Sequence, residues 1–207
     1  MHVPVARQPP RDPRDPRDHG DPVEDAAVAR FFVLTGGPGS GKSTLLGALA
    51  RIGFFCPDEA GRGVIQDQVA IGGPALPWRD PLRFAELMLS WDMRSYRMAH
   101  AHAGPVLFDR GIPDVVGYLR TAGVPVPAHI ARAARTFRYH RTVFIAPPWP
   151  EIFTRDEERR QSADEAARTH AAMVATYAGL GYTLVELPRA SVEARVQFML
   201  ARLPAHP

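Results

Sequence analysis

The stretch FVLTGGPGSGKSTLL, residues 32–46, decides the fold of this chain. It begins with an apolar run, passes through a glycine-rich segment and ends in residues that favour a helix, so we expect a strand, a loop and a helix in this order. The segment from Gly36 to Ser43 matches the pattern G-x-x-x-x-G-K-[ST] in full. In this context the match predicts a loop that binds phosphate groups, known as a P-loop.

Each residue type in this loop has a chemical reason to be there. Glycines let backbone N–H groups turn inward and hold phosphate oxygens, and the positive end of the following helix favours an anion. The hydroxyl group of Ser43 is placed to bind Mg²⁺. The residues expected to bind the nucleotide are Gly37, Gly39, Ser40, Gly41, Lys42, Ser43 and Thr44.

Lys42 is the only lysine in the chain, since all other basic residues in the Lys+Arg total of 25 are arginines. The compact ammonium group of a lysine can lie between the β- and γ-phosphates and follow the charge during transfer. A planar guanidinium group is too large and too rigid for this loop. We therefore interpret Lys42 as a functional requirement of the loop and expect it to be catalytic.

Composition limits the classes of protein to which the chain can belong. Its 207 residues, 45% of them hydrophobic, can form one good core, so we expect a single folded domain. The formal charge is +3, but the arginines are scattered among 22 acidic residues and form no run longer than two. This pattern does not indicate nucleic-acid binding.

Cysteine content and hydropathy indicate the compartment. The single cysteine, Cys56, cannot form an internal disulfide, which fits a reducing compartment. No apolar run approaches the roughly 18 residues that a membrane span needs, and the N-terminal residues lack the apolar core of a signal peptide. We expect a soluble cytoplasmic protein without membrane contacts that is a monomer or a homodimer.

The N-terminal segment differs in composition from the rest. The stretch RQPPRDPRDPRDHGDP, residues 7–22, repeats Arg-Asp-Pro and has no apolar periodicity. Because such a segment cannot offset the entropy lost on ordering, we expect residues 1–25 to be a disordered tail and residues 26–207 to be the folded domain. The alternative is that the tail is a docking segment or covers a partner.

Short apolar runs alternate with helical patterns along the rest of the chain. The runs lack the polar alternation of half-exposed strands, which predicts parallel strands joined by helical crossovers. The expected strands are 31–35, 54–56, 106–108, 142–146 and 183–187, and the expected helices are 42–52, 61–69, 82–103, 112–123, 128–138, 163–179 and 192–203. We therefore expect a three-layer α/β/α fold with a five-stranded parallel sheet and ligands beyond the carboxyl ends of the strands.

Residues after the third expected strand indicate metal binding and argue against two classes of hydrolase. Asp109 follows four apolar residues, as a Walker B acid does, and is placed to hold Mg²⁺ directly or through water. The next residue is Arg110, where a dedicated ATPase has a glutamate that polarises water. The usual GTPases need Asn-Lys-x-Asp to recognise guanine, and a chain whose only lysine is Lys42 cannot contain it.

The second expected strand ends in two carboxylates, Asp58 and Glu59, at the edge where a phosphate acceptor would lie. A carboxylate here can accept the proton of a hydroxyl group during transfer of the γ-phosphoryl group. We expect Asp58 to cap the following helix and Glu59 to act on the substrate. Both belong to the expected substrate site, together with Arg110 and Arg62, for which the alternative is an ordinary ion pair.

Two arginine-bearing segments complete the expected site. After the fourth strand, PPWP at 147–150 leads into a helix on which Arg155 and Arg159 share one face. This is the geometry of a lid, around residues 150–162, that closes over transferring phosphates. The alternative is pairing with nearby acidic residues on a solvated helix. After the fifth strand, Arg189 is placed to cover the adenine ring, and the alternative is a capped helix with no further role.

Segment 82–103 is expected to form one wall of the acceptor pocket. Its Trp91 and Tyr96 either stack on a flat ring or, as is more frequent for such residues, pack in the core. His100 and His102 are a weak signal for a metal, because no third ligand has matching spacing.

Four motifs together resemble the small bacterial P-loop proteins of the AAA-family ATPases. They are GGPGSGKST, the DRG at 109–111, PPWPEI followed by an arginine-rich helix, and the terminal LP…SVEARV. These proteins are related to the nicotinamide riboside kinase domain and, more distantly, to deoxynucleoside and thymidylate kinases. The resemblance runs from about Arg30 to Leu203 and implies a nucleoside-kinase-like P-loop fold that binds ATP with Mg²⁺.

The resemblance also implies a role for individual residues. It places Lys42 at the phosphates, Asp109 with Ser43 at magnesium and Glu59 near the acceptor. The lid arginines are Arg155 and Arg159.

Two functions are consistent with the sequence. The first is an ATP- and Mg²⁺-dependent kinase that transfers the γ-phosphoryl group to a small hydroxyl-bearing acceptor, such as a nucleoside or riboside. The second is a nucleotide-dependent binding or switch protein without acceptor phosphorylation. Glu59, Asp109 and the expected lid arginines favour the kinase.

Overall fold

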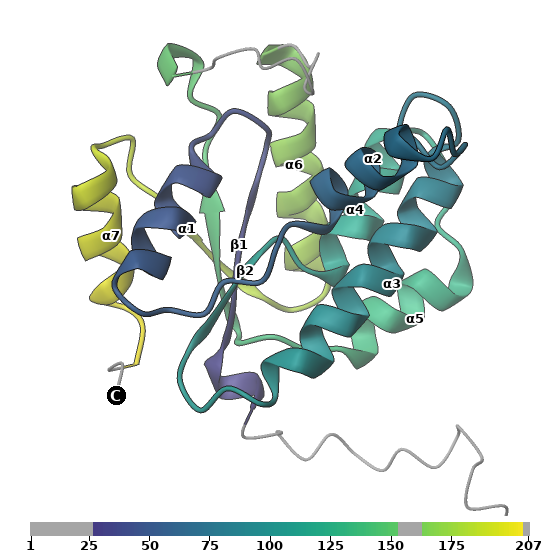
Figure 1. The fold of residues 1–207 in the computed structure, drawn as a ribbon. Helices are drawn as coiled ribbons and strands as arrows, with labels where there is room; N and C mark the ends of the chain where they lie inside the picture. Colours follow the sequence, from purple (N-terminus) through teal and green to yellow (C-terminus); the bar gives the residue numbers. More distant parts are fainter. Residues whose placement is uncertain (1–26, 153–162, 205–207) are drawn as a thin grey trace, which may run out of the picture.

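The sheet of this protein is parallel throughout. The structure, a computed structural model, describes residues 27–152 and 163–204. Its strands are β1 (Phe31–Gly36), β2 (Val106–Asp109), β3 (Thr142–Ala146) and β4 (Thr183–Glu186), in the order β2-β1-β3-β4. Because β1 lies between β2 and β3 and leads directly into the P-loop, the loop lies at the carboxyl edge of the sheet, where ligands bind in such folds (Figure 1).

Strand β1 is apolar along its length because both faces of the sheet are covered. Side chains alternate between the two faces of a strand. Phe31 and Val33 pack into one core, and Phe32 and Leu34 pack into the other. All four are at most 1% exposed. Burial on both faces therefore explains why the sequence shows no polar alternation here.

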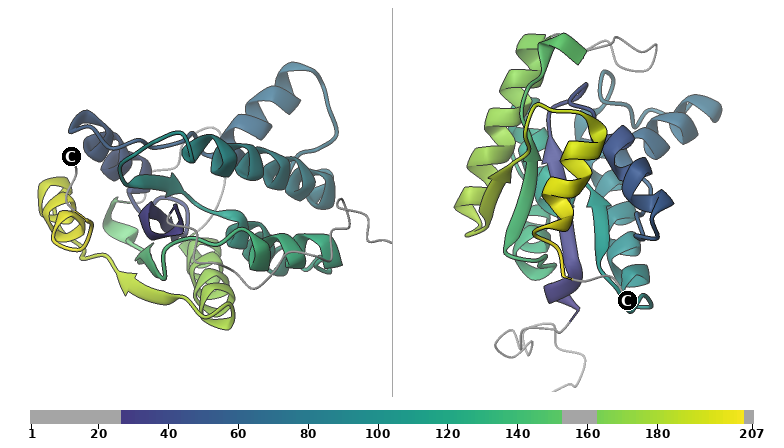
Figure 2. Two further views of the ribbon diagram at one scale, coloured as in Figure 1. Left: turned by 90° about the horizontal axis from the view of Figure 1, so that it is seen from below. Right: turned by 90° about the vertical axis from the view of Figure 1, so that its left-hand side faces the viewer.

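Helices cover both faces of the sheet, which confirms the predicted three-layer α/β/α fold. On one face lie α1 (Lys42–Arg51) and α7 (Val192–Leu200), and on the other lie α3 (Pro81–Ala99), α4 (Ile112–Thr121) and α6 (Ala163–Gly179) (Figures 1 and 2). Helix α2 (Ala60–Ala70) packs on α3, and α5 (Ala128–Thr136) packs on α4. The 3₁₀ helices η1 (Val28–Arg30) and η2 (Pro150–Ile152) precede β1 and follow β3.

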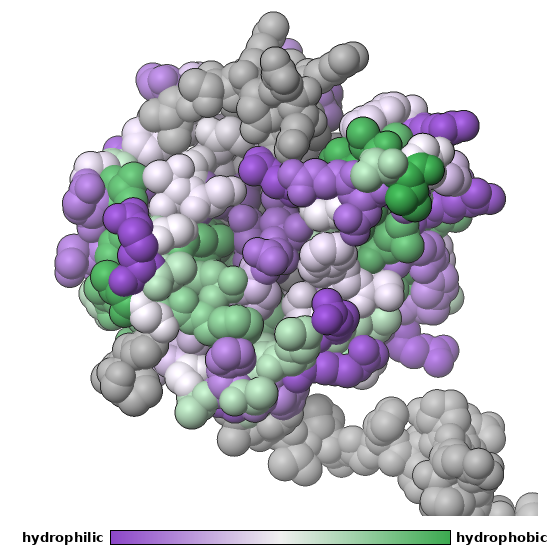
Figure 3. Space-filling model, in the orientation of Figure 1, coloured by the Kyte–Doolittle hydropathy of each residue, from purple (hydrophilic) through white to green (hydrophobic). Residues whose placement is uncertain are grey.

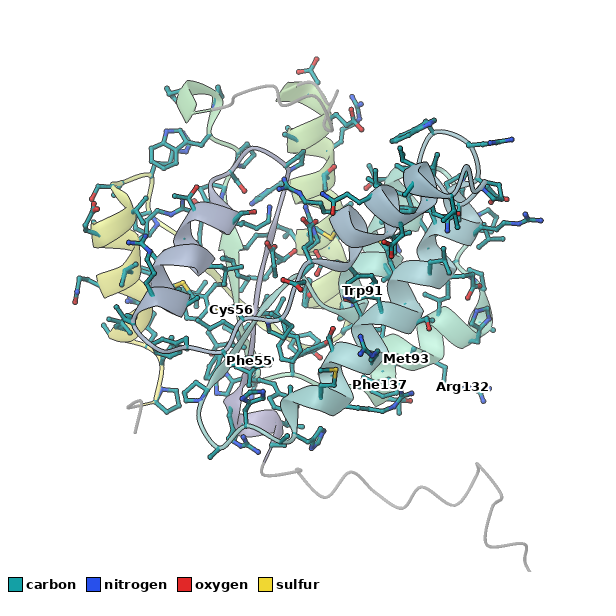
Figure 4. The ribbon with its side chains drawn as sticks, viewed as in Figure 1. Phe55, Cys56, Trp91, Met93, Arg132 and Phe137 are labelled. Carbon is teal, nitrogen blue, oxygen red and sulfur yellow. The ribbon has the colours of Figure 1, made fainter. Side chains whose placement is uncertain are left out.

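The predicted fifth strand, 54–56, is wrong. The chain makes one isolated parallel bridge there, between Phe55 and Val106, and the amide of Leu107 donates a 2.9 Å hydrogen bond to the carbonyl oxygen of Phe55. In a parallel ladder the next bond would come from the N–H group of residue 57, which is Pro57 and has none. The pairing therefore ends after one residue, and Phe55 and Cys56 lie beside the sheet as an edge segment (Figure 4).

Helix α3 presents one apolar stripe to the interior. Its N-cap, Asp80, accepts a 3.0 Å hydrogen bond from the amide of Arg83, and proline occupies the first helical position. Phe84, Met88 and Tyr96 follow at helical spacing and are buried. The helix therefore forms a firm floor for the space between α2 and α4.

Two sequence predictions fall outside the described residues. They are the disordered tail, residues 1–25, and the arginine-bearing part of the lid with Arg155 and Arg159. Within residues 27–152 and 163–204, no helix combines the length and apolarity required to cross a bilayer.

Candidate active site

The P-loop forms an open helix terminus. Gly41, the N-cap of α1, has a φ of 74°, a left-handed conformation that glycine adopts without steric cost. No side chain from the described part of the chain caps this helix end. Its first backbone N–H groups are therefore available to an anion. Ser43 and Thr44 in the first turn are exposed.

Lys42 is held inside the loop. Its side chain is 5% exposed, and Nζ donates hydrogen bonds to the carbonyl oxygens of Gly37 (2.7 Å) and Gly36 (3.1 Å). The hydroxyl group of Ser40 donates a further 2.8 Å bond to the Gly37 carbonyl. A Cβ atom at Gly37 would lie 2.6 Å from the carbonyl oxygen of Ala166 in α6, so only glycine fits. The loop is thus pre-shaped around the ammonium group.

Asp109 lies at the carboxyl end of β2, and Ser43 lies in the first turn of α1, which follows the neighbouring strand β1 and the P-loop. Asp109 is the last residue of β2 and is paired in register with Leu34 of β1, whose strand leads into the P-loop and Ser43. A hydroxyl group and a carboxylate are the hard oxygen donors that Mg²⁺ prefers. That these two residues bind Mg²⁺ together stays a prediction. In the described part of the chain, no group of three or more His, Cys, Asp or Glu side chains gathers elsewhere to hold a metal.

Arg110 connects the end of β2 to the end of the edge segment. Its φ is 71°, an uncommon conformation for a residue with a side chain. The Nε atom donates a 3.1 Å hydrogen bond to Glu59 Oε1, and Nη1 donates a 3.2 Å bond to Asp114 Oδ1. Burial by itself lowers the pKa of this guanidinium group, but the neighbouring carboxylates of Glu59 and Asp114 outweigh it and raise the pKa above its usual value. Arg110 is therefore a permanent cation that fixes the Glu59 carboxylate.

Asp114 holds the guanidinium group of Arg110 in place from helix α4. It is 4% exposed and lies in the first turn of α4. Besides Arg110, its carboxylate accepts hydrogen bonds from the hydroxyl groups of Thr35 and Tyr177 and from the amide of Gly111. With both oxygens engaged, Asp114 is a structural partner of Arg110.

A cavity of about 930 Å³ opens from this polar end. Pro38 of the P-loop, Glu59, Arg62, Arg110 and Asp114 line it near the sheet. Further out the lining is mainly apolar and comes from α2, α3, α4 and the loop that joins α2 to α3: Ile65, Val69, Trp78, Phe84, Met88, Val115 and Tyr118. The size suits a small organic ligand. In Figure 3 hydrophilic residues surround the hollow in the middle of the view, and apolar residues gather towards the tip that joins α2 to α3.

Asp92 lies on the floor of this cavity. It occupies the apolar stripe of α3, four residues after Met88, and is 9% exposed. Burial raises its pKa well above the usual value, and the carboxylates of Asp114 and Glu59 raise it further. It makes no hydrogen bond or ion pair with any residue in the described ranges.

Arg195 lies behind the P-loop. This α7 residue is 2% exposed, its Nη1 atom donates a 3.1 Å hydrogen bond to the carbonyl oxygen of Ser40, and its guanidinium carbon lies 5.7 Å from the centre of the Trp149 ring. Among the described residues, its Nε and Nη2 atoms have no hydrogen-bond partner. Burial lowers its pKa.

The expected site residues are distributed as follows. Glu59, Arg62 and Arg110 line the cavity, but Asp58 is exposed and does not. The prediction that Asp58 caps α2 is wrong, because Glu59 occupies the N-cap position and makes no side-chain capping bond. The helix therefore begins one residue later than a cap at Asp58 would require. Arg189 is exposed in the loop between β4 and α7, and its adenine role stays a prediction.

The two aromatic candidates on α3 pack in the protein interior. Tyr96 is 7% exposed, donates a 2.7 Å hydrogen bond to the carbonyl oxygen of Arg138, and contacts Phe137 edge to face. Trp91 packs against Gly63 of α2 (Figure 4). Neither lines the cavity, where Phe84 and Met88 supply the α3 wall instead. His102 stacks on Phe55 with ring centres 3.5 Å apart.

Comparisons relate this chain to known proteins. Residues 31–195 match a family model described as an AAA domain. No curated protein matches the chain significantly.

Solved structures of nucleoside and nucleotide kinases share the fold. Deoxyadenosine kinase from M. mycoides, with the products dCMP and dCDP, aligns with a TM-score of 0.63 and 12% identity over 83% of this chain and 97% of that chain. NadR in complex with NR aligns with a TM-score of 0.62 and 16% identity over 84% of this chain and 50% of that one. Thymidylate kinase from Ehrlichia chaffeensis aligns with a TM-score of 0.57 and 13% identity over 83% and 97%. At such identities the shared property is the fold.

Proposed function

This chain belongs to the AAA-domain family, and on that premise we propose that it is an ATP- and Mg²⁺-dependent kinase. It transfers the γ-phosphoryl group to a hydroxyl group of a small acceptor, such as a nucleoside or riboside. The kinases that share its fold support this class of reaction, since two act on deoxynucleosides or nucleotides by name and a third was solved with NR.

The position of Glu59 carries the proposal. Its carboxylate lies where the P-loop meets the cavity, and Arg110 binds Oε1 at 3.1 Å. A fixed carboxylate between a phosphate cradle and a ligand-sized cavity is the arrangement that a phosphoryl transfer to a hydroxyl requires. A protein that only hydrolyses or senses a nucleotide does not need a cavity for an acceptor beside its P-loop.

The proposed reaction is a single displacement. The acceptor hydroxyl group donates a hydrogen bond to the Glu59 carboxylate, and its oxygen attacks the γ-phosphorus atom. The bond from this phosphorus to the β,γ-bridging oxygen breaks, ADP leaves, and Glu59 takes the hydroxyl proton. Lys42 and the open N-terminus of α1 stabilise the charge on the phosphate oxygens throughout.

In this proposal Ser43 and Asp109 would hold Mg²⁺, which would supply neutralisation of the phosphate charge. The nucleotide is ATP in preference to GTP, because the chain has no Asn-Lys-x-Asp segment to recognise guanine. Tighter binding of GTP in a competition experiment would count against that choice.

Acceptor-dependent release of ADP tests the proposal. The full chain is incubated with Mg²⁺ and ATP, with and without each member of a panel of nucleosides, ribosides and amino alcohols, and ADP is quantified. A kinase releases ADP faster with at least one acceptor, and the product gains 80 Da as a phosphate ester, roughly the mass of one phosphoryl group. A switch protein shows the same slow rate with every compound.

A further inference from the structure

The carboxyl group of Asp92 is buried and lines the cavity in which we expect the acceptor to bind. It lies on the floor of the cavity, it is 9% exposed, and it makes no hydrogen bond or ion pair with another of the described residues. Buried polar groups in folded proteins are normally paired, and one without a partner indicates a position at which a ligand, water or ion binds. The catalytic role proposed for Glu59 makes no use of it.

The charges around Asp92 are unbalanced. The groups that act on it are the carboxylates of Asp114, Glu59 and Asp109, and the guanidinium group of Arg110. Arg110 is already shared between Glu59 and Asp114 through direct hydrogen bonds. Glu59, Asp92 and Asp114 thus share this end of the cavity with Arg62 and Arg110, and the hydrogen bonds of Arg110 go to Glu59 and Asp114, not to Asp92.

The remaining lining of the cavity is suited to a ligand with a flat or apolar moiety. Met88 and Phe84 lie on the same stripe of α3 as Asp92, one and two turns towards the start of the helix, and Tyr118 of α4 packs edge to face on Phe84 with ring centres 5.3 Å apart. A ligand that fills this space has its inner end at Asp92 and Glu59. The acceptor hydroxyl group and the group facing Asp92 therefore belong to the same end of the molecule.

From this geometry, and resting on the proposed kinase function, we propose that the acceptor carries a positively charged nitrogen close to the hydroxyl group that is phosphorylated, and that Asp92 binds this cation. Amino sugars, amino alcohols and N-glycosides of cationic heteroaromatic rings have this chemistry. Asp92 is a specificity-determining residue, and Glu59 remains the base.

Pairing with a ligand cation removes the cost of burying this carboxylate. A desolvated anion without a partner is unfavourable, whereas a buried pair with good contacts regains much of the lost solvation. The positive charge also offsets the excess of carboxylates beside the transferring phosphate. A neutral acceptor leaves Asp92 either ionised and unpaired or protonated, and in both cases gains no ionic contact.

Direct binding to matched ligand pairs tests the inference without requiring turnover. The first pair is an N-ribosylpyridinium cation and its neutral 1,4-dihydropyridine counterpart, which differ by one hydride. The second pair is glucosamine and glucose, which differ by an ammonium group in place of a hydroxyl group. Titration calorimetry at neutral pH measures Kd for the wild type, Asp92→Asn and the matched control Asp67→Asn, which removes an exposed carboxylate on α2.

We expect the charged member of at least one pair to bind the wild type roughly tenfold or more tightly than its neutral partner, as a hydrogen bond to a charged group implies. Asp92→Asn abolishes this preference, and Asp67→Asn retains it. The inference is overturned if the neutral member binds equally well or better, if no member of either pair binds, or if Asp92→Asn keeps the preference. The wild-type measurement alone decides the first two outcomes, even if Asp92→Asn does not fold.

Failure here and failure of the kinase proposal give different results. If a charged ligand binds through Asp92 but no acceptor accelerates ADP release, the cation site stands and the kinase assignment falls. If neutral acceptors are phosphorylated and Asp92→Asn turns them over at the wild-type rate, the kinase assignment stands and the cation site falls.

Discussion

The Nη1 atom of Arg195 donates a 3.1 Å hydrogen bond to the carbonyl oxygen of Ser40, so a buried cation in the last helix holds the P-loop from behind. The other side of its guanidinium group faces the Trp149 ring at 5.7 Å. Burial lowers the pKa of Arg195, so the charged guanidinium group makes the free protein less stable. A bound polyphosphate reduces this destabilisation through its negative charge.

Replacing Arg195 should therefore weaken phosphate binding at a distance. We expect Arg195→Met to raise Kd for both ATP and inorganic tripolyphosphate on the order of tenfold, because the variant loses a charge and the bond that positions Ser40. Calorimetry with the two ligands measures this. The control is Arg202→Met, an exposed arginine just after α7. A loss seen with ATP alone would instead mean that Arg195 recognises the nucleoside.

Lys42→Ala should abolish stabilisation by nucleotide. The variant keeps the fold but loses the ammonium group that the P-loop surrounds, so Tm should no longer rise when Mg²⁺ and ATP are added. Lys42→Arg should behave in the same way, because the loop holds the compact group through carbonyl oxygens at 2.7 and 3.1 Å. Arg51→Ala, at the other end of α1, is the control for the thermal shift assay. An undiminished shift in either Lys42 variant would contradict the assignment.

Glu59→Gln should separate binding from chemistry. The amide keeps the shape of the carboxylate but cannot take a proton, so ATP affinity should stay unchanged while acceptor-dependent turnover falls on the order of 10²–10⁴-fold. Asp67→Asn on the same helix is the control. Steady-state rates with an identified acceptor and a separate Kd for ATP provide both numbers. Turnover at the wild-type rate would remove Glu59 from the mechanism.

Asp92→Asn should stabilise the free protein near neutral pH. Asp92 has a folded-state pKa above its unfolded value, so the stability due to its neutral form is present below the unfolded pKa and is lost as pH rises through the folded pKa. Asparagine does not ionise and avoids this loss. The Tm of the variant should exceed that of the wild type by a few degrees at pH 7 to 8, roughly, and the difference should shrink as the pH falls towards about 4. A difference that is constant with pH would show that Asp92 does not titrate in this way.

Cys56 should be unreactive in the folded protein. Burial, and then the nearby Asp109 carboxylate, raise its pKa to about 12, so almost no thiolate exists at neutral pH. Its Sγ atom lies 3.8 Å from the carbonyl oxygens of Leu46 and Phe54. An aromatic disulfide reagent at pH 8 should react far more slowly with the native protein than with the protein in guanidinium chloride. Equal rates would mean that the thiol is exposed.

Sequence patterns predicted the structure best where one segment determines both the fold and a binding site, as in β1 and the P-loop. The P-loop pattern and the doubly buried β1 predict the layers, and the residues after the strands predict Glu59 and Arg110 as substrate-site residues, both of which line the cavity. The strand at 54–56 could not be placed correctly by apolar pattern alone, because the missing N–H group of Pro57 acts on pairing with a partner strand. The capping role of Asp58 was wrong because Glu59, one residue later, occupies the N-cap position of α2.

Asp92 and Arg195, which sequence reasoning missed, are both charged residues on the apolar stripe of a helix, and this pattern is visible in the sequence. Asp92 interrupts the stripe of Phe84, Met88 and Tyr96, and Arg195 stands four residues before the buried Met199. A charged residue on the buried stripe of a helix has to meet a partner or a ligand. The pattern marks such positions, but which partner meets them depends on contacts between distant segments.

The isolated bridge at Phe55 also bears on motion. Between the end of α1 and the start of α2, the backbone bonds of the edge segment include Phe54 to Leu49 and Leu107 to Phe55, and the latter is its link to the sheet. Segments with few such bonds open locally at a lower free energy than the core. Amide hydrogen exchange should therefore be faster at 54–59 than in β1, and each opening moves the backbone that carries Glu59. The base of the proposed reaction thus lies on a part of the chain whose order a bound acceptor can increase.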